Sequence, residues 1–347
     1  MGTVFTFQPY NITFLNFIIL PLLFLILCSI NKRSKNIYRK KAYLRYLFLT
    51  GYSFGFGFFL TGTYWISNSL QFDENFKDFI PVVIILLPLF LGLFFALATM
   101  ISGIFLKFDF KSILIFSAMM SIFDYLRSKI FTGFPWNLWA YSWSWLAETL
   151  QILNPIGVFA FNLIVITIFT IPAILFFKKE KYKFIYIIFS ALLFFFNYIY
   201  GDYIINKNRQ EYANTIKEKK FINIKVVSPN FKLKYDLNEE ELDKRVKKLI
   251  KYSDPDKDKK TLFIWPEGSL SGQYFEEIVK YKNLIEKNFS KNHLIIFGVN
   301  TKSKKNDDFY NSFLVIDNDF KKQFEYNKIK LVPFGEFLPF ENLFYKF

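Results

Sequence analysis

The first 200 residues contain a series of long apolar runs, and no other feature of the sequence constrains the fold as strongly. The first run, 12–30, carries no charged residue, and a helix needs about 20 mostly apolar residues to cross a membrane. The second run is rich in glycine, which allows close contact between helices. The sequence therefore predicts a multi-pass α-helical membrane domain of about six helices over residues 1–202. The predicted spans are residues 12–30, 46–66, 79–106, 112–126, 155–177 and 184–200.

The loops between these runs alternate in charge. Residues 32–45 carry seven basic and no acidic side chains, 178–183 are again strongly basic, and 107–111 are basic on balance. Because Lys-rich and Arg-rich loops remain in the cytoplasm, we predict that these three loops face it; in a bacterium the membrane would then be the inner (cytoplasmic) membrane. The opposite, periplasmic side then holds the N-terminus, the loops 67–78 and 128–150, and everything after residue 201.

The overall charge and the scarcity of cysteine and histidine exclude several kinds of partner. A net charge of +15 suits nucleic acid, but much of it lies in the short loops, so membrane topology explains it and no nucleic-acid partner is predicted. Cys28 and His293 are the only residues of their kinds, which excludes an internal disulfide and a His/Cys metal cluster. No metal and no cofactor are predicted. We expect Cys28 to be an ordinary buried helix residue and His293 to have a structural role at a strand edge.

Two features of the predicted membrane domain, Asp124 and the loop 128–150, can each be interpreted in two ways. Asp124 lies near the end of a predicted span, where a carboxylate is either a functional group or the structural partner of Arg127. The loop 128–150 is aromatic, which is typical of the membrane–water interface but also of a lip that binds lipid. Its tryptophans are Trp136, Trp139, Trp143 and Trp145.

Residues 203–347 differ in pattern, since they are rich in lysine and carry charges of both signs between short apolar runs. A polar linker, about 203–220, comes first. Strands and helices then alternate, and the last strands follow one another directly, an order that predicts an α/β domain with helices covering a sheet. We expect strands at 221–228, 261–265, 293–299, 309–316 and 322–327.

Two amphipathic helices are expected between the first three strands. Asp236 can cap the first of them. The apolar positions recur at helical spacing. They are Leu242, Val246, Leu249 and Ile250 in the first helix, and Tyr274, Ile278, Tyr281 and Ile285 in the second.

Three charged side chains near strand ends could carry chemistry. Glu267 follows a Trp-Pro pair after an apolar run, Lys328 follows the last predicted strand, and Glu336 follows a Pro-Phe-Gly turn. Strand ends are where α/β folds present catalytic groups. A carboxylate shielded by Trp265 can act as a general base, and a lysine beside a developing oxyanion stabilises it. Surface ion pairs use the same residue types, so the types alone leave both interpretations open.

The strings around these residues are more specific. Trp265-Pro-Glu267 and Tyr326-x-Lys-x-x-Leu-Val-Pro-Phe-Gly-Glu336 resemble the carbon–nitrogen hydrolase (nitrilase) superfamily. More narrowly, the chain resembles the apolipoprotein N-acyltransferases, a family of multi-pass bacterial membrane enzymes, over nearly its whole length. Further similar stretches are Gly55-Phe-Gly-Phe-Phe-Leu-Thr-Gly-Thr-Tyr-Trp65, Thr132-Gly-Phe-Pro-Trp136 and Tyr310-Asn-Ser312.

This resemblance implies a fold and a reaction. The family has a periplasmic nitrilase-type αββα sandwich with a Glu-Lys-Cys triad, so a membrane domain followed by such a domain at 203–347 is expected. A phospholipid, phosphatidylethanolamine or a similar one, donates an acyl chain to the Cys. The thioester then acylates the S-diacylglyceryl-cysteine at the N-terminus of an apolipoprotein, the acceptor. By resemblance, Glu267 is the general base, Lys328 the oxyanion stabiliser and Glu336 a supporting carboxylate.

The chain departs from the family pattern in one important respect. The nucleophilic Cys is expected after the Leu-Val-Pro-Phe-Gly-Glu string, and this sequence has no Cys after Cys28. We therefore expect a C-terminally truncated sequence with a partial sandwich and uncovered apolar faces, inactive on its own. Two alternatives stay open: another membrane-bound nitrilase-type amidase, or a catalytically inactive membrane protein that binds lipid or partners.

Overall fold

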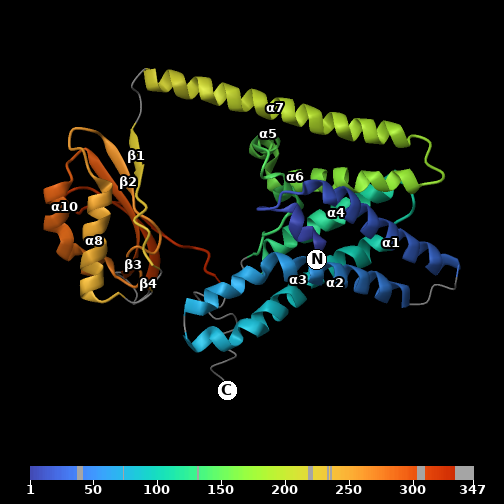
Figure 1. Ribbon diagram of the computed structural model, residues 1–347, viewed down its shortest axis with the longest axis horizontal. Helices are drawn as coiled ribbons and strands as arrows, with labels where there is room; N and C mark the ends of the chain where they lie inside the picture. The colour runs from blue at the N-terminus through green and yellow to red at the C-terminus, as the bar shows by residue number, and fades with distance from the viewer. Residues whose placement is uncertain are drawn as a thin grey trace. The chain divides into compact units, whose positions relative to one another are not determined.

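The computed structural model describes residues 1–36, 42–72, 74–130, 133–217, 222–232, 234, 237–302 and 309–332. The chain forms two compact units, Met1–Tyr212 and Ala213–Phe347. Figure 1 shows helices in the first unit and a sheet with helices in the second. Each unit is described by itself.

Six long helices build the first unit, and each overlaps a predicted span. They are α1 (Asn16–Asn36), α2 (Ala42–Thr63), α3 (Ile80–Gly103), α4 (Phe110–Arg127), α6 (Leu153–Thr170) and α7 (Lys183–Lys217). Shorter helical pieces are η1 (Gly2–Thr6), η2 (Thr13–Leu15), η3 (Tyr64–Phe72), η4 (Glu74–Phe79), η6 (Trp139–Trp143), α5 (Ala147–Leu150) and η7 (Ile171–Phe176).

Four helical stretches in the described part of the chain are long and apolar enough to cross a membrane, which indicates a membrane protein. They are Thr13–Ser34, Lys77–Gly103, Leu153–Phe176 and Lys183–Lys217. The spans expected at 46–66 and 112–126 form α2 and α4, and their crossing of the membrane stays a prediction.

Glycines bring α2 against α3, as the composition of the second run indicates. A Cβ atom on Gly51 would lie 1.8 Å from Thr99 Oγ1, and one on Gly55 would lie 2.8 Å from the Phe95 ring. Aromatic rings fill the space beside this contact, with Phe58 packed edge-on against Phe95 at 5.3 Å between ring centroids. Any larger residue at Gly51 would separate the two helices.

Helix α7 extends beyond its apolar part. The residues expected to form a polar linker, 203–220, are helical as far as Lys217, because they contain no proline and include good helix formers. Within the first unit, Gly201 lets α7 approach α5, since a Cβ there would lie 1.8 Å from the carbonyl oxygen of Glu148. The linker prediction therefore missed a helix.

The second unit contains a five-stranded sheet in the order β1-β2-β3-β4-β5. Strands β1 to β3 are parallel, and β4 and β5 are antiparallel to their neighbours. The strands expected from the sequence all form, and the α/β class is confirmed. Their bounds are β1 (Asn223–Val226), β2 (Thr261–Ile264), β3 (His293–Lys302), β4 (Phe309–Ile316) and β5 (Lys322–Asn327). The last two strands have the expected bounds, and the first three differ at their ends.

Helices between the parallel strands cover one face of this sheet (Figure 1). Helix α8 (Glu239–Ser253) has Asn238 as its N-cap, because the Asn238 side chain accepts a hydrogen bond from the backbone N–H of Glu241. Asp236, the expected cap, lies outside the described residues. The second expected helix is divided into α9 (Phe275–Ile278), η8 (Val279–Tyr281) and α10 (Lys282–Asn288). The apolar positions predicted for α8 are buried, as are Ile278, Tyr281 and Ile285.

The opposite face of the sheet is apolar and open to solvent. The strand register places alternate side chains of all five strands on it. Its most exposed members, Ile224, Val226, Phe313, Phe324 and Tyr326, are between 41% and 70% exposed. Among the described residues, this unit is therefore a single sheet with helices on one side.

Candidate functional site

The strand order brings Glu267 and Lys328 to the same edge of the sheet. This edge is the one at which the parallel strands β1 to β3 have their carboxyl ends. Glu267 follows the carboxyl end of β2, and the backbone N–H of Trp265 still pairs with β3 through the carbonyl of Ile296 at 2.9 Å. Lys328 follows β5, and its N–H donates to the carbonyl of Asn311 at 2.9 Å. Because Asn311 pairs with Asn300 near the carboxyl end of β3, both loops leave the sheet at that end.

Glu267 lies in a turn and is exposed. The Trp265 side chain, two residues earlier, is buried on the helix-covered face of the sheet, where alternation along β2 places it. There the Trp265 ring packs on Phe297 at 5.7 Å between centroids and donates its Nε1–H to Ser253 Oγ at 3.0 Å. The expectation that Trp265 shields the Glu267 carboxylate is therefore wrong for this unit.

The turn after Glu267 depends on glycine. Gly268 and Gly272 have φ of 68° and 75°, a region that side chains with a Cβ rarely adopt. Ser271 Oγ donates to the carbonyl of Gly268 at 2.8 Å. The Glu267 side chain, at the start of this turn, is exposed.

A polar chain links three strands beside Lys328. The Thr301 and Ser312 hydroxyls are 2.6 Å apart, and Ser312 Oγ donates to Asn327 Oδ1 at 2.7 Å. Thr301 and Ser312 are buried, and Lys328 is half-buried. Ser312, from the Tyr310-Asn-Ser312 string, thus helps to hold the end of β5 in place. Thr301 and Asn327 take part in the same chain of hydrogen bonds, and nothing in their local sequence indicated this.

Glu336 lies outside the described residues. The structure therefore brings two of the three predicted site residues to one sheet edge, and it leaves the position of the third as a prediction. All three roles rest on the resemblance and stay predictions here.

Cys28 and His293 have the structural roles expected of them. Cys28 is fully buried in α1, and its Sγ–H donates to the carbonyl of Lys107 at 3.3 Å. His293 begins β3, is 1% exposed, and its Nε2 lies 2.9 Å from the carbonyl oxygen of Asp256. Neither residue belongs to the sheet edge that carries Glu267.

Asp124 pairs with Arg127, which favours the structural interpretation of this carboxylate. Arg127 Nη2 lies 2.8 Å from Asp124 Oδ1, and Asn162 Nδ2 donates to Asp124 Oδ2 at 2.9 Å. Arg127 Nη1 also donates to the carbonyls of Phe134 and Trp136, at 2.6 and 2.8 Å. The buried pair therefore holds the aromatic loop against α4 and α6.

The tryptophans of that loop fall into two classes. Trp139 and Trp143 are buried in the core of the first unit, whereas Trp136 and Trp145 are 52% and 42% exposed. Trp136 packs edge-on against Trp65, with 5.4 Å between ring centroids. The belt and the lipid-binding lip therefore remain alternatives for the exposed rings only.

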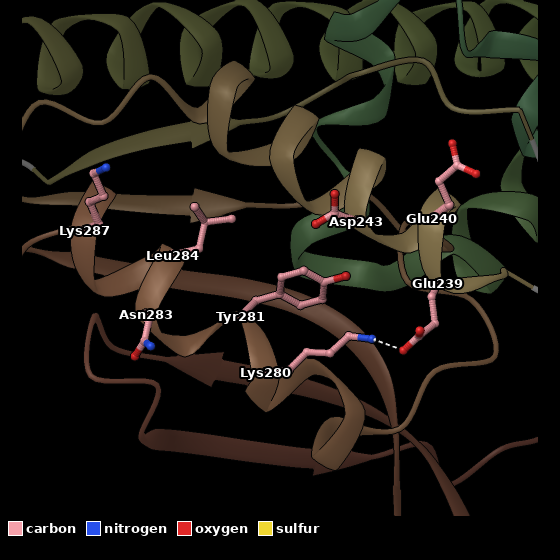
Figure 2. A pocket seen from close by; sticks show the side chains of 8 residues that line it. All are labelled: Glu239, Glu240, Asp243, Lys280, Tyr281, Asn283, Leu284 and Lys287. Carbon is pink, nitrogen blue, oxygen red and sulfur yellow. Dashed lines mark hydrogen bonds and ion pairs between the residues drawn. The ribbon is translucent and has the colours of Figure 1, made fainter.

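Figure 2 shows a groove between α8 and the α9–α10 segment. Glu239 and Lys280 form an ion pair of 2.9 Å at one end, and the hydrogen bond from Lys280 lowers the pKa of the Glu239 carboxyl. The lining contains none of the predicted site residues. It consists of Glu239, Glu240, Asp243, Lys280, Tyr281, Asn283, Leu284 and Lys287.

The sequence is similar to one family of proteins. Residues 1–171 match the family model of the apolipoprotein N-acyltransferase N-terminal domain. Bacterial relatives with the name apolipoprotein N-acyltransferase include one from Rickettsia prowazekii, 32% identical over 84% of this chain and 58% of the relative. Another, from Rickettsia bellii, is 30% identical over 90% of this chain and 60% of the relative. The relative from Brucella melitensis is 27% identical over 84% and 55%. The chain thus spans somewhat under two thirds of the length of these relatives.

Proposed function

Because the chain belongs to the apolipoprotein N-acyltransferase family, we propose that it contributes to the transfer of an acyl chain from a phospholipid to the N-terminal S-diacylglyceryl-cysteine of apolipoproteins. The name of the relatives supports this activity. Since the chain spans 58% to 60% of the two Rickettsia relatives cited, the activity is proposed for the whole protein that contains these residues.

The observation that carries the proposal is the shared sheet edge of Glu267 and Lys328. In the first step, Glu267 accepts a thiol proton, and the thiolate attacks the phospholipid ester carbonyl while Lys328 stabilises the oxyanion. The ester C–O bond breaks, and the lysophospholipid leaves with the proton. In the second step the α-amino group attacks the thioester, the C–S bond breaks, and the amide forms while the proton returns to the thiol. Glu336 supports Lys328 in this scheme.

The thiol of this scheme is not Cys28. Cys28 is buried in an apolar helix of the first unit, with its Sγ–H bonded to a backbone carbonyl. A nucleophile must instead reach the proton acceptor within hydrogen-bond distance. We therefore assign no nucleophile among these 347 residues.

The open apolar face of the sheet supports a nitrilase-type sandwich. Contiguous exposed apolar patches mark surfaces that interact with another protein surface, a membrane or a ligand. We propose that a second sheet packs on the face that carries Val226 and Phe324, which would complete an αββα arrangement. Such a sheet would remove the most exposed apolar side chains of the unit from water.

We also propose that the second unit is periplasmic and that the first anchors it in the inner membrane. The three basic loops predict this orientation consistently. Both proposed substrates are held in the membrane by their own acyl chains. An anchored enzyme would meet them at a high effective concentration, which lowers the entropic cost of bringing the reactants together.

A chimeric enzyme tests the proposal. Residues 1–347 replace the aligned part of the Rickettsia prowazekii relative, and mass spectrometry measures transfer from phosphatidylethanolamine to a diacylglyceryl-cysteine peptide in proteoliposomes. Loss of the base or of the oxyanion donor, in Glu267→Gln or Lys328→Met, should lower the rate by roughly 10²- to 10³-fold. The matched control Cys28→Ala should retain the parent rate. Variants at Glu267 and Lys328 that match the parent rate would contradict the proposal, and release of ammonia from amides without lipid would favour the amidase alternative.

A further inference from the structure

Arg245, on α8, contacts the backbone of the two residues that follow Glu267 in the sequence. Its Nη1 donates to the carbonyls of Gly268 and Ser269, at 3.2 and 3.3 Å. Its Nη2 donates to the carbonyl of Lys232, in the loop after β1, at 2.7 Å. The side chain is only 8% exposed. One guanidinium therefore ties together the loops after β1 and β2, which leave the sheet at the edge of Glu267.

Arg245 contacts the middle of the loop that carries Glu267. Its two ends are attached to β3, through the N–H of Trp265 and through the carbonyl of Gln273, which accepts from Asn300 at 3.0 Å. Between these points, Ser269 Oγ is buried and has no hydrogen-bond partner among the described residues. Arg245 therefore supplies the attachment that the loop side chain does not.

The chemistry of this contact suits arginine and no other side chain. A guanidinium is planar, stays charged, and presents several N–H donors in fixed directions, whereas lysine offers a single ammonium. The Arg245 guanidinium also lies over the ring of Phe231, 4.8 Å from its centroid, which fixes its plane. An ammonium at this position could not reach both loops at once.

We propose that Arg245 is a positioning residue: it fixes the peptide units that follow Gly268 and Ser269, in the turn that begins at Glu267, and so sets the direction of the Glu267 carboxylate. The proposal rests on the role of Glu267 as general base, given above. The neighbouring lysines of α8 differ in kind. Lys247, for example, is exposed and pairs with Asp243 on its own helix at 2.6 Å.

Hydrogen exchange of the full chain in detergent tests the positioning without any need for acyl transfer. In Arg245→Gln, amides of residues 265–272 should exchange at least about tenfold faster, while those of β3 keep the wild-type rate. Arg245→Lys should give an intermediate increase confined to the same loop, and the control Lys247→Gln should give none. Loop exchange that matches wild type, or an equal increase in β3, would overturn the proposal. If Arg245→Gln does not fold, Arg245→Lys decides by the same criterion.

Kinetics of the chimera separate this inference from the proposed function. A displaced base lowers turnover more than substrate binding, so Arg245→Gln should lower kcat by roughly 10- to 100-fold with KM nearly unchanged. An equal fall in activity through KM alone would contradict the positioning role. If Glu267→Gln stays fully active, the proposed function fails, and the exchange result still judges the contact of Arg245 with the loop.

Discussion

At the scale of single residues, a capping box forms the start of α8. The Asn238 side chain accepts from the N–H of Glu241 at 2.9 Å, and the Glu241 carboxylate accepts from the N–H of Asn238 at 3.3 Å. Lys234 donates to the same carboxylate at 2.7 Å. This capping box orients the helix that carries Arg245.

Removal of the cap should destabilise the second unit. Asn238→Ala leaves a helix N–H without its acceptor and should cost about 1 kcal/mol in the free energy of unfolding. Asn283→Ala, at an exposed position of α10, is the control and should cost almost nothing.

The hydrogen bond from Lys234 lowers the pKa of Glu241 below its ordinary value of 4.5. The stability that Glu241 contributes is therefore complete above pH 4.5 and is lost as the pH falls through the lower, folded-state pKa. Urea unfolding at a series of pH values measures both effects. An Asn238→Ala variant as stable as wild type would contradict the first, and a Glu241→Gln variant with the same acid dependence as wild type would contradict the second.

The sequence predicted the residues that belong to local strings, and it missed those that act through pairing between distant segments. Glu267 and Lys328 stand out because each follows a strand in a specific string. Arg245 is one basic residue among many on α8, and only the folded chain shows that it meets the loop after β2. The shielding expected from Trp265 was wrong because strand alternation turns that ring into the core.

At the scale of elements, the sequence predicted the helices and strands, but it predicted the ends of only some of them, such as β4 and β5. The second helix of the α/β unit carries a correct apolar face, yet it is divided into α9, η8 and α10. Helix α7 continues into the expected linker because propensity extends it where apolar residues end. The hydrogen bonds of Asp124 join Arg127 on α4 to Asn162 on α6, so the pattern of one helix alone could not decide the role of this carboxylate.

The buried pair of α4 should be essential to the first unit. Arg127→Met leaves the Asp124 carboxylate buried without its partner, which typically costs about 3–5 kcal/mol. We expect a clearly lower unfolding temperature in detergent and faster exchange in residues 133–145. The double variant Asp124→Leu/Arg127→Met should recover part of the loss, and the exposed Lys129→Met should behave like wild type. An unchanged unfolding temperature in Arg127→Met would show that the pair does not hold the loop.

At the scale of the whole molecule, a helical unit with four apolar stretches long enough to span a membrane precedes a sheet with one open apolar face. The order of the two units and the α/β class followed from composition and periodicity. The bare face depends on the register of five strands, and the family resemblance rather than any periodicity indicated what would cover it. The proposed acyl transfer unites these features, because it needs a membrane anchor and a site at the end of the sheet.

The acyl-enzyme is the most direct test of this account. The chimera is incubated with phosphatidylethanolamine without an acceptor peptide, and its intact mass is measured. We predict a gain of one acyl chain at a residue other than Cys28, with the same gain in Cys28→Ala and none in Glu267→Gln. Equal acylation of Glu267→Gln, or an acyl chain located on Cys28, would contradict the proposed roles of Glu267 and of the sheet edge that it shares with Lys328.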